Sequence, residues 1–242
     1  MRAGAERDAS TPGTAPGDFR EDVVVPCGDV VLPATLTVPR EARAVVVFAH
    51  GSGSGRTSPR NRFVADAFHA AGLATLLMDM TVPGDAMEQE ASSQRSQDVA
   101  ILARRLAAAA RWIARHGTTQ ALPQGVFGSS TGAAAALLAA ARPMTPIRAV
   151  VCRGGRTDLA GAAIADVTVP TLLVVGGEDS WVLGINREAL ERLAGEKELV
   201  VVPGAGHLFE EPGALARVAS AAAAWFQRHL VFGPAGTWTT TA

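Results

Sequence analysis

The stretch GVFGSSTGAAAA, residues 125–136, decides the fold of this chain. A short apolar run at 125–127 is typical of a buried strand, and the alanines from 133 onward favour a helix. Between them stands Gly-Ser-Ser-Thr-Gly, which has the pattern G-x-S-x-G. Its glycines allow a sharp turn from strand to helix, and such a turn lifts the serine hydroxyl above the sheet. We therefore predict a strand–turn–helix unit with Ser130 as a nucleophile at its apex.

The pentapeptide alone is a weak signal, because glycine and serine are common in ordinary turns. Its surroundings strengthen it. Short apolar runs alternate with longer segments that carry apolar residues at helical spacing, and this alternation predicts a parallel sheet with right-handed crossovers. The expected strands are residues 44–49, 74–78, 125–127, 149–152, 171–175 and 199–202; the expected helices are 59–71, 96–116, 132–141, 181–194 and 213–229.

Two alternating apolar and polar segments, residues 22–26 and 30–38, precede this pattern and predict an antiparallel hairpin. No polar linker divides the chain, so we expect one domain over residues 20–232. Residues 1–19 and 233–242 contain too few apolar residues to offset the entropy of ordering, and we expect both tails to be disordered. The fold class is α/β: a doubly wound, mostly parallel sheet with helices on both faces. Ligands of such sheets bind at the carboxyl ends of the strands.

A serine nucleophile needs a base, and two of the five histidines directly follow predicted strands. His50 follows the strand at 44–49, and His207 follows the last strand. In sheets of this class the catalytic residues occur in the chain order nucleophile, acid, base. His50 precedes Ser130, so this order selects His207 as the base.

The acid should lie between Ser130 and His207 and should also follow a strand. Asp179 meets both conditions in the segment Gly-Gly-Glu-Asp-Ser, residues 176–180. Its expected role is to hold the imidazole tautomer and to stabilise the imidazolium. Glu178, beside it, and Asp158, after the preceding strand, remain as alternatives.

A glycine-rich loop, His-Gly-Ser-Gly-Ser-Gly at residues 50–55, follows the strand at 44–49. Glycines let backbone N–H groups converge on a small atom, so the loop is expected to supply half of an oxyanion hole. The expected donors are the N–H of Ser52 or of Gly51, together with that of Thr131 at the helix N-terminus. His50 is expected to brace the loop. The loop lacks the lysine of a P-loop and the spacing of a dinucleotide fingerprint, so a nucleotide site is not predicted.

Charge and cysteine content limit the partners and the compartment. The chain has 22 basic and 23 acidic residues, a net charge of -1. This balance gives no electrostatic reason to expect nucleic acid or an anionic membrane as a partner. The first twenty residues show no secretory signal, and no apolar run is long enough to span a membrane. Both cysteines, Cys27 and Cys152, lie in apolar runs and are expected to be buried thiols. We expect a cytoplasmic enzyme with a small ligand.

From residue 30 to about residue 230 the chain resembles the dienelactone-hydrolase-like branch of the α/β-hydrolases. The resemblance implies the α/β-hydrolase fold, hydrolytic activity, and no metal or organic cofactor. The motifs also resemble a bacterial subgroup sometimes fused to a phosphoribosyltransferase domain. Dienelactone hydrolases use a cysteine nucleophile, whereas this chain has Ser130, and this departure favours a general esterase. The motifs that carry the resemblance are FAHGSGSGRTSPRN (48–61), GSSTGAAAA (128–136), RGGRTDLA (153–160), VGGEDSWV (175–182) and GAGHLFEEPGAL (204–215).

Cover over the site is expected to be minimal. The interval from residue 153 to 169 has room for one short helix at 159–165, which excludes a large lid there; the loop at 81–95 is the other segment that could cover the site. An open site favours short acyl esters or small lactones over long-chain lipids. Met80 and Trp181 are candidates for the acyl pocket. Arginines near the site could bind an anionic substrate or could simply pair with loop carboxylates, and the second interpretation is favoured; they are Arg56, Arg60, Arg62, Arg153 and Arg156.

The sequence therefore predicts a serine hydrolase that cleaves carboxylic esters through an acyl-enzyme intermediate. Acyl transfer to an alcohol or amine uses the same residues and remains an alternative. A non-catalytic binding protein is less favoured, because all three triad members are present. The sequence does not indicate the oligomeric state.

Overall fold

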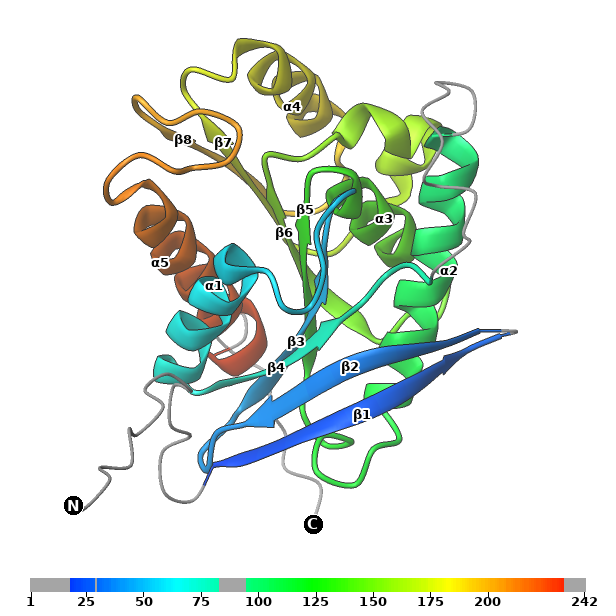
Figure 1. Ribbon diagram of the computed structural model, residues 1–242. Helices are drawn as coiled ribbons and strands as arrows, with labels where there is room; N and C mark the ends of the chain where they lie inside the picture. The colour runs from blue at the N-terminus through cyan, green and yellow to red at the C-terminus, as the bar shows by residue number, and fades with distance from the viewer. Residues whose placement is uncertain (1–17, 29, 83–94, 233–242) are drawn as a thin grey trace, which may run out of the picture.

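The computed structural model describes residues 18–28, 30–82 and 95–232, and within them one eight-stranded sheet carries helices on both faces (Figure 1). The strand order is β1-β2-β4-β3-β5-β6-β7-β8. Strands β3 to β8 run parallel, whereas β2 pairs antiparallel with both β1 and β4. The predicted doubly wound sheet and the antiparallel hairpin at its start are confirmed. The strands are β1 (Phe19–Cys27), β2 (Val30–Val38), β3 (Ala44–Ala49), β4 (Leu73–Met78), β5 (Gln124–Ser129), β6 (Ile147–Arg153), β7 (Thr171–Gly176) and β8 (Lys197–Val202).

Two apolar clusters fill the space between the sheet and its helices. On one face α1 and α5 pack over the aromatic side chains of β3 and β5, and on the other α2, α3 and η2 pack over the aliphatic side chains (Figure 1). Helix α4 packs on β7, β8 and η2. The helices are α1 (Pro59–Ala70), α2 (Arg95–Ile113), α3 (Thr131–Ala140), α4 (Ser180–Arg192) and α5 (Ala214–Phe226), with a 3-10 segment η2 (Thr157–Asp166) and a π-helical segment η3 (Gln227–Phe232).

Helix α3 lies unusually close to the sheet, because its side chains are small. The alanines at 133–136 are all buried, and the helix begins directly against the end of β3. A Cβ added to Gly132 would lie 2.1 Å from the carbonyl oxygen of Ala49, a distance that no side chain can adopt. Glycine at this position therefore fixes the height of the turn at Ser130 above the sheet.

The structure differs from the sequence prediction at a few element ends. Strand β1 begins at Phe19, three residues before the predicted start, because its first residues are exposed and show no apolar pattern. The short helix between β6 and β7 is a 3-10 segment and extends over Thr157–Asp166. Most of the two predicted tails and of the loop at 81–95 lies outside the described residues. Among the described helices, none has the length and apolar character needed to cross a membrane.

Candidate active site

Ser130 lies at the junction of β5 and α3 in a backbone conformation that residues other than glycine rarely adopt. Its φ is 52° and its ψ is -121°. The turn is held by backbone hydrogen bonds: the Ser130 N–H donates to the Arg153 carbonyl at 3.1 Å, and the Ser130 carbonyl accepts the Arg156 N–H at 3.0 Å. A strained residue kept in place by its surroundings is a common feature of active sites. The strand–turn–helix unit read from the motif is therefore present, with the serine at its apex.

The imidazole of His207 is hydrogen-bonded to the carboxylate of Asp179. Nδ1 of the ring and Oδ2 of Asp179 are 2.6 Å apart, a short distance typical of a charge-assisted hydrogen bond. Because a carboxylate can only accept, Nδ1 carries the proton and donates it, which leaves Nε2 free to act as a base. The Asp179 side chain is 16% exposed and that of His207 is 39% exposed, so the pair opens to solvent on the imidazole side.

The His207 ring lies beside the turn that holds Ser130. A Cβ added to Gly154 would lie 3.4 Å from Cε1 of His207, so the ring rests against this glycine. Gly154 directly follows Arg153, whose carbonyl accepts the Ser130 N–H. The loop that carries His207 is itself fastened by Glu211, which accepts the Gly206 N–H at 2.9 Å. The three residues selected from the sequence thus follow the carboxyl ends of β5, β7 and β8, with Asp179 bonded to His207 and the His207 ring beside Gly154, next to the Ser130 turn.

The two alternative acids are engaged elsewhere. Asp158 forms a bidentate ion pair with Arg156, with distances of 2.9 and 2.7 Å to Nε and Nη2. The Glu178 side chain is exposed to solvent, and the polar contact of this residue is a backbone hydrogen bond to the carbonyl of Ala205. Of the three candidates, Asp179 alone is paired with His207.

The glycine-rich loop after β3 packs against Ser130. A Cβ added to Gly51 would lie 2.9 Å from Cβ and 3.5 Å from Oγ of Ser130. The Ser52 N–H donates to Oγ1 of Thr131 at 3.2 Å, so this predicted oxyanion donor already has an acceptor. The loop therefore contacts Ser130 and the first residue of α3, and the oxyanion hole stays a prediction.

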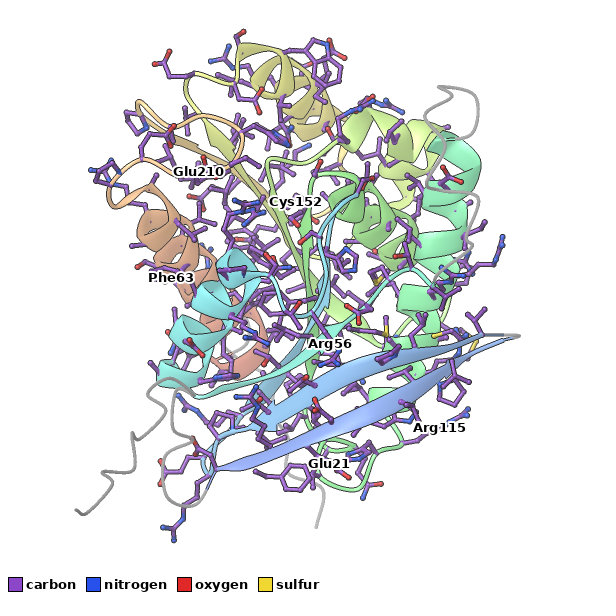
Figure 2. The ribbon with its side chains drawn as sticks, viewed as in Figure 1. Glu21, Arg56, Phe63, Arg115, Cys152 and Glu210 are labelled. Carbon is purple, nitrogen blue, oxygen red and sulfur yellow. The ribbon has the colours of Figure 1, made fainter. Side chains whose placement is uncertain are left out.

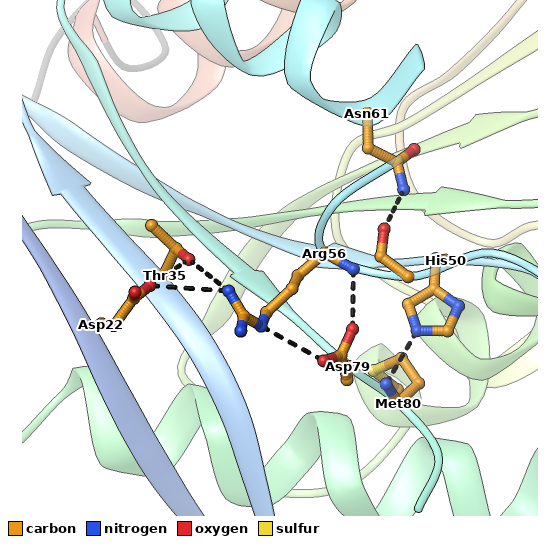
Figure 3. A network of polar contacts seen from close by, with 8 residues as sticks. Asp22, Thr35, His50, Arg56, Asn61, Asp79 and Met80 are labelled. Atoms are coloured by element: carbon orange, nitrogen blue, oxygen red, sulfur yellow. Dashed lines mark hydrogen bonds and ion pairs between the residues drawn. The ribbon is translucent and has the colours of Figure 1, made fainter. Parts of the chain in front are cut away.

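His50 braces this loop from inside. Its Nε2 accepts the Met80 N–H at 2.8 Å (Figure 3). The ring proton is therefore on Nδ1, which donates to the Gly51 carbonyl at 2.9 Å. Burial lowers the pKa of His50, against the opposing effects of the Gly51 carbonyl and the charge of Asp79. A neutral imidazole with both nitrogens occupied is a structural group and has no free nitrogen to serve as a base.

Arg56 belongs to a second network that ties the loop to β4 and to the hairpin of β1 and β2 (Figure 3). Asp79 accepts the Arg56 backbone N–H at 2.8 Å and forms an ion pair with Nε at 3.2 Å. Nη1 donates to Oγ1 of Thr35 at 3.2 Å and lies 3.5 Å from Asp22. These contacts agree with the favoured interpretation, in which the arginine pairs with a loop carboxylate; the candidate substrate role of Arg56 is corrected, because its guanidinium already has partners.

The other predicted substrate contacts differ in their exposure. Met80 is fully buried in the core, so it presents no surface to a ligand, which corrects its assignment to the acyl pocket. Trp181 is 57% exposed, and the Arg156 guanidinium stacks on its ring at 4.8 Å. Arg153 is only 8% exposed and forms no ion pair with any described residue.

The sequence analysis did not single out Gly154 or Glu211. The glycine pair directly after β6 is the sequence signal that could have indicated Gly154.

Neither cysteine can replace Ser130 as a nucleophile. Cys152 is fully buried in β6, and burial raises the pKa of its thiol to about 12 (Figure 2). Burial also raises the pKa of Cys27. Both are free thiols, as predicted. The described residues contain no group of three or more histidine, cysteine or carboxylate side chains placed to hold a metal ion.

Comparison with known proteins agrees with this architecture. The model of a family described as "Alpha/beta hydrolase family" matches residues 4–219. The chain therefore belongs to the α/β-hydrolase family. Within it, the chain is dienelactone-hydrolase-like: the crystal structure of a dienelactone hydrolase from Anabaena variabilis is 48% identical, with a TM-score of 0.82 over 88% of this chain and 99% of that one.

Two further comparisons differ in what they show. Proteins of two Mycobacterium tuberculosis strains, named "Putative phosphoribosyl transferase", are 49% identical over 233 residues. The match covers 96% of this chain but 52% of theirs, so the chain spans about half the length of these relatives. A cold-adapted esterase from an Arctic metagenomic library is 18% identical, with a TM-score of 0.68 over 88% of this chain and 96% of that one, and shows the fold alone.

Proposed function

We propose that this protein hydrolyses carboxylic esters through an acyl-enzyme intermediate, with Ser130 as nucleophile, His207 as base and Asp179 as the acid that orients it. The observation that carries the proposal is the 2.6 Å hydrogen bond between His207 and Asp179 at the edge of the Ser130 turn. With Nδ1 donating to Asp179, Nε2 is the ring nitrogen that serves as the base in this proposal.

The chemistry follows from these positions. Nε2 of His207 removes the proton from Oγ of Ser130 as the oxygen attacks the ester carbonyl, and the Asp179 carboxylate stabilises the imidazolium that forms. The same Nε2 then gives the proton to the departing alcohol, and the acyl group stays on Ser130. Water, activated by His207, attacks this acyl-enzyme and releases the acid.

The negative charge that develops on the carbonyl oxygen needs donors beside Ser130. The N–H of Thr131 lies at the N-terminus of α3, where the helix dipole favours negative charge. The second donor in the proposal is the N–H of Ser52 or of Gly51. For Ser52 to act as a donor, its N–H must break its 3.2 Å hydrogen bond to the Thr131 hydroxyl and donate to the oxyanion instead. The charged oxyanion is the stronger acceptor of the two.

Short acyl esters or small lactones are the proposed substrates. Only the 3-10 segment η2 lies between β6 and β7, so this interval supplies no helical lid over Ser130. The likeness to a dienelactone hydrolase, at 48% identity, supports small ester or lactone substrates. The transferase name of the mycobacterial relatives refers to proteins about twice as long as this chain, and the part matched here carries the hydrolase family pattern.

Labelling with a fluorophosphonate probe tests the nucleophile. The wild-type protein should be labelled at Ser130 and should hydrolyse p-nitrophenyl acetate. Ser130→Ala should abolish labelling and lower turnover about 10³-fold or more, because triad residues act as a unit. Ser129→Ala, at the preceding buried residue, is the matched control and should remain labelled. Labelling that persists in Ser130→Ala would refute the assignment, and product analysis with added alcohols would reveal acyl transfer.

A further inference from the structure

Arg153, the last residue of β6, is a buried cation without a counter-charge. Its side chain forms no ion pair within the described residues, and Nη1 is buried without any hydrogen-bond partner. Buried charges in proteins are almost always paired, because removing a charge from water is costly unless a partner compensates it. The guanidinium nevertheless stays protonated at neutral pH, since burial, followed by the charge of Arg60, lowers its pKa only to about 10.

The position of this guanidinium follows from the alternation of side chains along β6. Val150 and Cys152 pack in the cluster under α2 and α3, whereas Ala149 and Val151 pack under α1 and α5. Arg153 therefore points to the α1 side of the sheet. Arg60, the second residue of α1, belongs to the helix on this same side of the sheet, and its charge adds to the lowering of the pKa of Arg153.

A second cation and a helix N-terminus lie on this side of the sheet, beside the loop that carries His207. Arg60 reaches the loop that carries His207 through an exposed ion pair with Glu210 at 2.9 Å (Figure 2 labels Glu210). Helix α1, twelve residues long, begins here without a side-chain cap at Ser58, so its first N–H groups add partial positive charge. The Arg153 carbonyl meanwhile holds the Ser130 N–H. The backbone of Arg153 thus adjoins the Ser130 turn, and Arg60 is bonded to the loop that carries His207.

We infer that Arg153 and Arg60 form a subsite for a phosphate group, so that the ester cleaved at Ser130 carries a phosphate on its acyl or alcohol part. The part of the inference that concerns ester cleavage rests on the proposed function. The part that concerns phosphate binding by Arg153 and Arg60 does not. A carboxylate has two oxygens, which one guanidinium already engages in a bidentate pair. A phosphate monoester has three terminal oxygens and nearly two charges, so it can accept hydrogen bonds from both guanidinium groups together.

Phosphate binding is tested first in the Ser130→Ala chain, which removes turnover from the measurement. Inorganic phosphate, titrated by calorimetry at constant ionic strength, should bind saturably. Arg153→Met should weaken the binding about tenfold or more, the loss expected when charge-assisted hydrogen bonds are removed. Arg60→Met should weaken it as well, which keeps the test decisive if Arg153→Met does not fold. Arg148→Met, an exposed arginine on the same strand, is the matched control and should leave binding unchanged.

The substrate class is tested with three acetate esters of similar length, whose alcohols end in phosphate, carboxylate or methyl. The phosphate ester should have the highest kcat/KM, and its advantage over the methyl-ended ester should collapse in Arg153→Met but not in Arg148→Met. Absence of saturable phosphate binding, or binding that survives Arg153→Met, would overturn the subsite. A preference for the carboxylate ester would overturn the assignment to phosphate. Inactivity toward all three esters with phosphate binding intact would refute the proposed function alone.

Discussion

Nδ1 of His207 and Oδ2 of Asp179 lie 2.6 Å apart, although 28 residues (207 − 179) separate them in the chain. Strand β7 delivers the aspartate and the loop after β8 delivers the histidine, and the two strands are parallel neighbours. Their carboxyl ends therefore meet at one edge of the sheet. The pairing fixes the ring tautomer, on which the proposed chemistry depends.

Replacing Asp179 by asparagine should keep the fold but hold the His207 ring in the wrong tautomer for catalysis. An amide N–H₂ in place of the carboxylate favours the tautomer with the proton on Nε2, so turnover should fall about 10²- to 10⁴-fold. Asp158→Asn is the matched control, because Asp158 pairs with Arg156 and not with His207. Steady-state kinetics on p-nitrophenyl acetate measures both. If Asp158→Asn proved the more damaging change, the assignment of the acid would be wrong.

Gly51→Ala should impair catalysis through steric crowding alone. The added methyl would lie 2.9 Å from Cβ of Ser130 and 3.1 Å from the Ser129 carbonyl oxygen, so the loop or the nucleophile must shift. A displacement of about 1 Å can cost about 10²-fold in rate, and we expect a loss of that order in kcat.

Gly184→Ala in α4 provides the contrast for the previous substitution. A Cβ there meets nothing within 4 Å, and the residue is inside a helix. Alanine should raise the free energy of unfolding by about 0.5–1 kcal/mol and leave kcat unchanged. Urea denaturation and kinetics on both variants separate crowding at the site from a general effect of losing a glycine.

The free energy of unfolding should fall as the pH decreases below about 6.5, the ordinary pKa of histidine. Burial lowers the pKa of His50, so below that pH the imidazole becomes protonated in the unfolded chain while it stays neutral in the folded chain. Lower pH therefore favours the unfolded state. Burial also lowers the pKa values of His69 and His229, which act in the same direction. Denaturation at pH 7.5 and 5.5 should show this loss. His50→Gln should have a smaller loss over the same interval; an equal loss would exclude His50 as a contributor.

Acyl chain length should show how much cover the site has. Each buried methylene contributes about 0.8 kcal/mol at most, and methylenes left in water contribute nothing. Because η2 alone lies between β6 and β7, we expect kcat/KM to peak at acetyl to butyryl esters and to fall by hexanoyl or octanoyl. Rates that keep rising through decanoyl would assign a covering role to the loop at 81–95.

The order of strands and helices was predictable, because strands buried on both faces appear as continuous apolar runs. The edges were not. Strand β1 begins at Phe19 among exposed residues, where no core imposes a pattern. The positions of Asp179 and His207 followed from chain order and from the rule that loops at the carboxyl ends of parallel strands meet.

Contacts between segments distant in the chain were out of reach of the sequence. Pairing of Arg56 with a loop carboxylate was the favoured interpretation, and Asp79 provides that partner, but nothing in a one-dimensional pattern places Thr35 of β2 beside the loop after β3. Met80 was expected in the pocket and is buried, because its N–H and carbonyl are fixed by His50 and Arg105. Arg153 was one of five arginines expected at the edge of the site, and only the fold showed that it is buried.

The positive φ of Ser130 sets activity against stability. A sparsely populated backbone region of this kind costs an L-residue about 1–3 kcal/mol, whereas glycine adopts positive φ readily. Glycine at this position would therefore relieve the backbone and remove the nucleophile in one step. The most stable sequence for this fold and the active sequence must then differ at residue 130, so selection for thermal stability alone would lead the protein away from its chemistry.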